Sequence, residues 1–184
     1  MDRIKNIATL LEKNTLVWER HFTVTPVKLW DAIANKDGLS RWFMPTKYEI
    51  EDGGRFSFHE GWDGIVSELV PLHHIVFIPD ESKDAYLRFD VIKTEAGCLF
   101  KLTDKMGPTV DASRKFTDSP DRLKYQPGGI GTHWSGAVSG YHSFVDSLET
   151  HITGDRQQHF LPYEDLNDRY CEALKEWHLV VEDL

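Results

Sequence analysis

Histidine is the residue type in this chain that most readily suggests metal or acid–base chemistry, and there are nine histidines. His73 and His74 are adjacent, and neighbours on a strand point to opposite faces of a sheet. His133, His142 and His151 are nine residues apart, which places successive members on opposite sides of a helix. The sequence therefore predicts surface histidines, no metal site and no cofactor.

The cysteines and glycine-rich stretches do not form a recognisable reactive site. Cys98 and Cys171 are far apart and outside any CxxC pair, which excludes a disulfide framework and the usual zinc spacings. Cys98 falls in an expected strand, as a buried apolar cysteine does. Gly53-Gly54 reads as a hairpin turn and residues 128–131 precede a helix, where free N–H groups could meet an anion. Neither stretch continues into the Lys-Ser/Thr of a phosphate-binding loop.

Arg20 is a charged residue in an apolar strand pattern. It shares one face of an expected strand with Trp18 and Phe22, and that face should point inward. An inward arginine needs an anionic or hydrogen-bonding partner. Glu68 and a ligand carboxylate are the two candidates, and a rim position whose charge reaches water is the alternative.

The chain is rich in large rings, with 10 Phe, 6 Trp and 6 Tyr. Rings of this size either fill a core or leave an apolar pocket with a few polar groups. We expect the following residues to line such a pocket: Trp18, Arg20, Trp42, Phe43, Phe56, Phe58, Phe77, Phe89, Phe100, Trp134, Tyr141 and Val145.

The elements that must position these residues follow a simple order. Strand-like segments from 48–51 onward, separated by turns, predict an antiparallel meander. Val138, Tyr141, Val145 and Leu148 belong to the apolar stripe of a long helix. We expect a single domain, 1–184, with these parts: an N-terminal helix (1–13); a strand, two short helices and the meander (14–106); a long loop (107–130); a long helix (131–154); and a C-terminal helix (161–178).

Charge and hydropathy exclude several classes of function. The 184 residues carry a formal net charge of −9, the wrong sign for a general nucleic-acid binder or for docking on anionic lipid. No apolar run approaches the ~20 residues of a membrane span. The first residues are charged throughout, unlike a signal peptide, so we expect a cytoplasmic protein.

Three stretches carry a resemblance to a known family. They are VTPVKLWDAIANKDGLSRWF (24–43), EDGGRFSF (51–58) followed by DGIVSELVP (63–71), and GYHSFVDSLETHITG (140–154). In order and spacing the chain resembles the START/polyketide-cyclase (SRPBCC, birch-pollen-allergen-like) superfamily. Within it, the chain is most similar to the group of the C-terminal domain of the heat-shock protein 90 ATPase activator. The resemblance implies an α+β helix-grip fold, a curved antiparallel sheet wrapped around the long helix, with extra short helices at both ends.

The resemblance and the rings favour a non-enzymatic module that binds a small hydrophobic or amphipathic ligand, such as a lipid, in a helix–sheet cavity. The first alternative is a protein-interaction module of the stress response, with a chaperone as partner. The second is a cyclase or hydrolase for an aromatic substrate, for which Arg20, Tyr141 and His142 are the candidates. The N-terminal helix and the small residues of the long helix are compatible with a homodimer.

Overall fold

An antiparallel sheet forms the body of the protein in a computed structural model that describes residues 7–12, 15–58, 62–81, 83–105 and 133–155, with residues 165, 166, 169, 170 and 173. Its strands and helices in chain order are β1 (Thr9–Glu12), β2 (Thr15–Phe22), α1 (Pro26–Ile33), α2 (Lys36–Trp42), β3 (Arg55–Phe58), β4 (Trp62–Val70), β5 (His74–Pro79), β6 (Tyr86–Thr94), β7 (Gly97–Lys105) and α4 (His133–Thr153).

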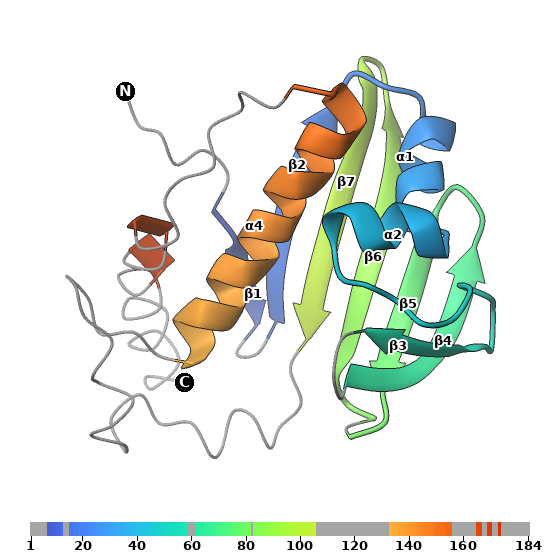
Figure 1. The fold of residues 1–184 in the computed structure, drawn as a ribbon. Coiled ribbons are helices and arrows are strands. Elements are labelled where there is room, and N and C mark those ends of the chain that lie inside the picture. Colours follow the sequence, from blue (N-terminus) through green and yellow to red (C-terminus); the bar gives the residue numbers. More distant parts are fainter. Residues whose placement is uncertain are drawn as a thin grey trace.

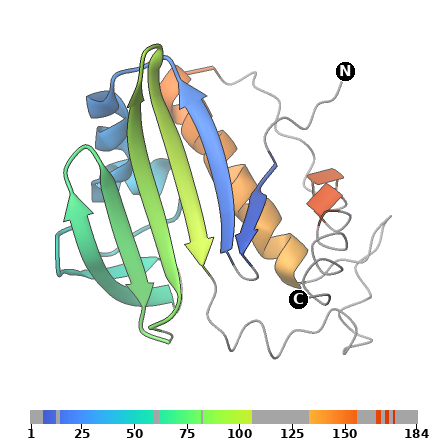
Figure 2. The ribbon, with the colours of Figure 1, turned by 180° about the vertical axis from the view of Figure 1, so that it is seen from behind.

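The sheet has seven strands in the order β1-β2-β7-β6-β5-β4-β3. The meander β3 to β7 brings the last strand back beside β2, with register from Thr15 opposite Lys105 to Phe22 opposite Cys98. α4 crosses one face of the curved sheet, and α1 and α2 lie on the same face (Figure 1). Seen from behind, the strands lie in front and these helices behind them (Figure 2). The predicted helix-grip fold is therefore confirmed.

Side-chain alternation along the strands explains why the sheet closes on the helix. Inward positions of β7 are Cys98, Phe100 and Leu102, all buried, and similar alternation holds in β3, β5 and β6. The helix α4 supplies the facing stripe, in which Val138, Val145, Leu148 and Ile152 are buried. These side chains belong to one apolar core that extends from Ala8 to Tyr170.

Short-range signals set the connections between elements. Thr25 caps α1 by accepting from the N–H of Lys28, and Pro26 stands at the first turn, where its missing N–H costs nothing. Gly64 in β4 has no room for a side chain, because an added Cβ would lie 2.1 Å from the carbonyl oxygen of Ile78. Gly154 ends α4 with φ 75°, a conformation that glycine adopts without strain.

Two secondary-structure predictions are wrong. Thr9–Glu12, placed in an N-terminal helix by apolar spacing, form strand β1. A helix this short is only marginally stable by itself, and pairing with β2 is the more stable alternative. Residues 48–51 form no strand, and the backbone pairs with β3 only through a bridge between Thr46 and Phe58.

Other predicted boundaries remain open. The expected loop 107–130 lies outside the described residues, as does most of the expected C-terminal helix, of which residues 165, 166, 169, 170 and 173 are described as helical. The single domain spanning 1–184 stays a prediction. Among the described residues, the structure contains no helix that is both long and apolar enough to cross a bilayer.

Candidate functional site

A continuous set of aromatic rings in mutual contact lies between α4, α2 and the sheet. We call it the aromatic cluster. Phe43, at the end of α2, lies at its centre: its ring centroid is 4.8 Å from that of Phe144 and 5.3 Å from that of Phe58. Neighbouring rings are 4.8–6.4 Å apart, many in edge-to-face geometry, the arrangement that aromatic quadrupoles favour. The cluster comprises Trp42, Phe43, Phe56, Phe58, Trp62, Phe77, Phe89, Phe100, Tyr141 and Phe144.

The cluster has a closed half and an accessible half. Phe56, Phe58, Phe77, Phe89 and Phe100 are fully buried on the inner face of the sheet and behave as core. By contrast, Trp62 on β4 and Tyr141 and Phe144 on α4 are only partly buried against that core. Any ligand that enters the cluster therefore meets these three rings before the phenylalanines of the sheet.

Most of the residues predicted to line a pocket come together here. Trp42, Phe43 and the five phenylalanines of the sheet join the aromatic cluster with Tyr141, and Val145 is buried on the same helix. Trp18 is fully buried, and its ring centroid lies 5.2 Å from that of Tyr141. Nothing is described of the Trp134 side chain. The sequence analysis missed Trp62 and Phe144, although both lie at inward positions of their elements.

Asp104 is a carboxylate on the inner face of the sheet. It follows Cys98, Phe100 and Leu102 in the alternation of β7, and its lateral neighbours in register are Leu16 and Leu87. Burial raises its pKa to about 7, and its negative charge in turn raises the pKa of Tyr141, which burial already lifts. Within the described part of the chain, no hydrogen bond or ion pair reaches Asp104.

The sequence analysis did not name Asp104 as a site residue. The alternation of β7 was sufficient to find it, because that pattern places residue 104 on the inward face. The residue is surrounded closely enough to be strongly desolvated, yet part of its surface stays accessible. Tyr141 shows the same combination. Both groups are therefore removed from bulk water while part of their surface stays accessible.

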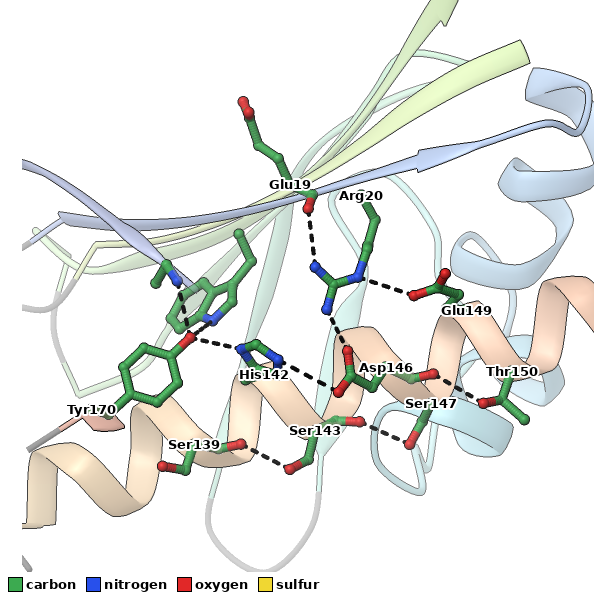
Figure 3. A network of polar contacts seen from close by, with 12 residues as sticks. Glu19, Arg20, Ser139, His142, Ser143, Asp146, Ser147, Glu149, Thr150 and Tyr170 are labelled. Atoms are coloured by element: carbon green, nitrogen blue, oxygen red, sulfur yellow. Dashed lines mark hydrogen bonds and ion pairs between the residues drawn. The ribbon is translucent and has the colours of Figure 1, made fainter. Parts of the chain in front are cut away.

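Arg20 is buried on the inward face of β2, and the predicted partner Glu68 is wrong. Its guanidinium pairs with Asp146 and with Glu149, where Nε is 3.1 Å from Oε2 (Figure 3). Glu68 instead lies 3.1 Å from Nε2 of His74 on β5. The anionic partners come from α4, which crosses β2 at this point, and strand alternation alone carries no information on that crossing.

Asp146 also belongs to a chain of polar contacts that runs through His142 to Tyr170 (Figure 3). The Tyr170 hydroxyl accepts from the backbone N–H of Ala8 at 2.9 Å and from Nε1–H of Trp18 at 3.0 Å. With both lone pairs used, its hydrogen is directed to Nδ1 of His142, 2.8 Å away. The ring proton of His142 is then on Nε2, which lies 3.5 Å from Oδ2 of Asp146.

Because Nδ1 accepts the hydroxyl hydrogen of Tyr170, His142 is held as a neutral imidazole. Burial lowers its pKa, Asp146 raises it and Arg20 lowers it. We call Arg20, His142, Asp146 and Tyr170 the polar latch, since these side chains join β2, α4 and the C-terminal part of the described chain. Arg20 and His142, two of the three candidates for catalysis, thus have internal partners.

Other chemistry-bearing groups do not assemble into a site. The Sγ atom of Cys98 is buried 3.4 Å from the carbonyl oxygen of Val24, and burial raises its pKa, which suits an inert thiol. Across the described ranges, no three His, Cys, Asp or Glu side chains are grouped to hold a metal ion.

A surface pocket of about 370 Å³ lies apart from the aromatic cluster, between α1, α2 and the end of α4. Its charges are mixed: Lys28 and Arg41 face Asp31 and Asp37. Burial and the two cations lower the pKa of His151, which also lines it. Opposite charges at one opening give no preference for an anion or a cation, so this pocket is not the candidate site.

The comparisons with known proteins agree with this fold. Residues 23–149 match a family model described as "Activator of Hsp90 ATPase homolog 1-like protein". No curated protein sequence matches the chain.

Solved structures share the architecture at low sequence identity. CalU16 from Micromonospora echinospora superposes with a TM-score of 0.62 at 15% identity, covering 89% of this chain and 87% of its own. A conserved protein of unknown function from Enterococcus faecalis, EF2215, gives 0.64 at 15% identity, covering 94% and 92%. DynU16, from the dynemicin biosynthetic locus, gives 0.55 at 11% identity, covering 80% of this chain and 50% of its own. At these identities the likeness establishes the fold alone.

Proposed function

Because the chain belongs to the family of activator of Hsp90 ATPase homolog 1-like proteins, we propose that it binds a small hydrophobic or amphipathic ligand between α4 and the sheet, without acting as an enzyme on it. One observation carries the proposal. The accessible rings of Trp62, Tyr141 and Phe144 continue into a closed aromatic core. An apolar pocket with a few polar groups is the usual form of a small-molecule site.

The absence of catalysis in this proposal rests on the polar groups. Arg20 and His142 are engaged in the polar latch, where each contacts partners within the fold. Asp104 faces the phenol of Tyr141, and no hydrogen bond or ion pair joins it to a described base that could relay a proton. A lone carboxylate in an apolar space serves recognition more readily than turnover.

The test uses an uncharged apolar dye, N-phenyl-1-naphthylamine, whose emission rises in apolar sites. We expect the purified protein to bind it at near unit stoichiometry. Trp62→Ala should weaken binding by about tenfold, equivalent to roughly 1.4 kcal/mol. Trp30→Ala is the matched control, because Trp30 is also partly buried against the core but makes no ring contact with the aromatic cluster.

Native mass spectrometry of freshly purified protein complements the titration, because a co-purifying molecule identifies the natural ligand class directly. Absence of dye binding, or equal loss in the two tryptophan variants, would overturn the proposal.

A second function is favoured by the family itself, whose description names an ATPase activator. The outer face of the sheet carries exposed Ile65 on β4 and Ile92 on β6, and no helix with described bounds covers that face (Figure 2). A chaperone-contact role would use this surface. It predicts that the protein raises the ATPase rate of a purified 90-kDa chaperone and that Ile65→Asp abolishes the effect. An unchanged ATPase rate would exclude it.

A further inference from the structure

Asp104 occupies a place in the fold where a carboxylate is costly. Its neighbours on the inner face of the sheet are Leu16 on β2, Leu87 on β6 and Leu102 on its own strand. None of these side chains donates a hydrogen bond, and burial of an ion without a partner is strongly unfavourable. An unpaired carboxylate at this position therefore destabilises the fold.

The charged side chains nearest in sequence do not compensate for it. Lys105 is on the opposite face of β7, with its ammonium 5.9 Å from the ring centroid of Tyr86. From α4, the titratable group that faces Asp104 is Tyr141, which stays a neutral phenol because both burial and the Asp104 charge raise its pKa. The partner for the carboxylate is thus not supplied by the described chain.

Strand direction places Asp104 at the same end of the sheet as the accessible half of the aromatic cluster. In an antiparallel sheet ordered β7-β6-β5-β4, the direction alternates from strand to strand. The last residues of β7 and the first residues of β4 therefore lie at the same end of the sheet. Asp104 is near the end of β7 and Trp62 begins β4, and Figures 1 and 2 show these two strand ends at the same end of the sheet. Tyr141 of α4 relates to both residues: its ring centroid is 6.4 Å from that of Trp62, and the Asp104 charge acts on its phenol.

A carboxylate beside ring faces recognises a cation. Aromatic faces attract ammonium groups through their quadrupole, and a nearby anion supplies the ion pair. The formal net charge of −9 also raises the local concentration of cationic ligands. An anionic ligand, such as a fatty acid, would meet like charge at Asp104.

We propose that the ligand of this site is an amphipathic amine, whose protonated nitrogen pairs with Asp104 while its apolar body packs on Trp62, Tyr141 and Phe144. This inference rests on the proposed function and adds the chemical class of the ligand. The amine fills the place of the missing partner, and the rings exclude the water that would weaken the pair.

The experiment measures binding of two matched probes by calorimetry at pH 8. 1-Naphthylmethylamine and 1-naphthylmethanol share one apolar body and differ in the cationic group. We expect the unmodified protein to bind the amine at least tenfold more tightly than the alcohol. Asp104→Asn, which keeps the side-chain shape, should weaken amine binding at least tenfold and change alcohol binding less than threefold.

Asp84→Asn is the control, because Asp84 is exposed in the turn before β6 and the substitution changes the net charge equally. It should leave the preference for the amine intact, which separates a specific ion pair from general steering. Equal binding of amine and alcohol by the unmodified protein, or a preference that survives Asp104→Asn, would overturn this inference and leave the proposed function standing. Binding of neither probe would overturn both.

Discussion

The hydroxyl of Tyr170 lies 2.8 Å from Nδ1 of His142, and this contact ties the C-terminal part of the described chain to α4. The two residues also meet edge to face, with ring centroids 5.7 Å apart. The same hydroxyl accepts from Ala8 and Trp18, so one oxygen satisfies groups from three distant parts of the chain. The Trp18 ring in turn packs on Tyr141, which connects the polar latch to the aromatic cluster.

Removal of the Tyr170 hydroxyl should lower the stability of the fold. Tyr170→Phe leaves the N–H of Ala8, Nε1–H of Trp18 and Nδ1 of His142 without a partner, and each buried orphan costs about 1–3 kcal/mol. We expect the free energy of unfolding in urea to fall by at least about 3 kcal/mol. Tyr48→Phe, at an exposed tyrosine, should leave it unchanged. Equal stability of the two variants would show that the hydroxyl is replaced by water.

The neutral state of His142 is measurable on its own. Burial lowers the pKa of His142 in the folded protein. Just below pH 6.5, the ordinary value, the imidazole is therefore protonated in the unfolded chain but still neutral in the folded one. Its contribution to stability is therefore present at neutral pH and is lost as the pH falls through and below 6.5. Nitrogen NMR should show the Nε2–H tautomer persisting below pH 6.5. Titration of this ring with an ordinary pKa would contradict the assignment.

The buried and exposed arginine pairs should respond differently to the same substitution. Arg20→Met leaves Asp146 and Glu149 partly buried without their cation, and the loss should be about 2–4 kcal/mol in urea unfolding. Arg55 forms an equivalent pair with Asp80 at an exposed site, where water replaces the partner. Arg55→Met should therefore change stability little, and a comparable loss at both positions would refute the distinction.

Asp104 predicts an unusual pH dependence. Its folded pKa of about 7 lies above the ordinary 3.8, so between these values the folded state holds a proton that the unfolded state has released. Stability from this group is lost as the pH rises from about 4 to about 7, by an amount on the order of 4 kcal/mol. Asp104→Asn removes the penalty, so it should be more stable than the unmodified protein at pH 8 and similar to it at pH 4.

Thermal unfolding of the Asp104→Asn and unmodified proteins across pH 4–8 measures how their difference in stability changes with pH. The Asp84→Asn protein should follow the unmodified one throughout, because its carboxylate is exposed in both states. A constant difference between the Asp104→Asn and unmodified proteins across the range would mean that the carboxylate is solvated in the fold.

Two glycines on different elements give opposite predictions for the same added methyl group. In Gly64→Ala the new Cβ would lie 2.1 Å from the Ile78 carbonyl oxygen and 2.5 Å from the Phe56 ring, so β4 must shift. We expect a loss of more than about 2 kcal/mol. Gly140 lies in α4 with open space around it, and Gly140→Ala should stabilise by about 0.5–1 kcal/mol. Chemical denaturation of both variants checks the contrast.

Local patterns made most of the fold predictable. Strand alternation placed Phe56, Phe58, Phe89 and Phe100 on the inner face, and helical spacing predicted α4, because both signals depend on residues within one element. Helix spacing failed at Thr9–Glu12, where pairing with β2 decides the conformation. The aromatic residues could be named, but their division into a closed and an accessible half could not.

The sequence by itself determined which faces are apolar, the order of the elements and the family to which they belong, since these depend on short-range periodicity. Tertiary structure alone decided which charges meet. Arg20 pairs with Asp146 and Glu149, more than a hundred positions away, because α4 crosses β2 there. Asp104 faces Tyr141 without a counter-ion for the same kind of reason. Partners of polar groups depend on the crossing of distant elements, and no local pattern encodes that crossing.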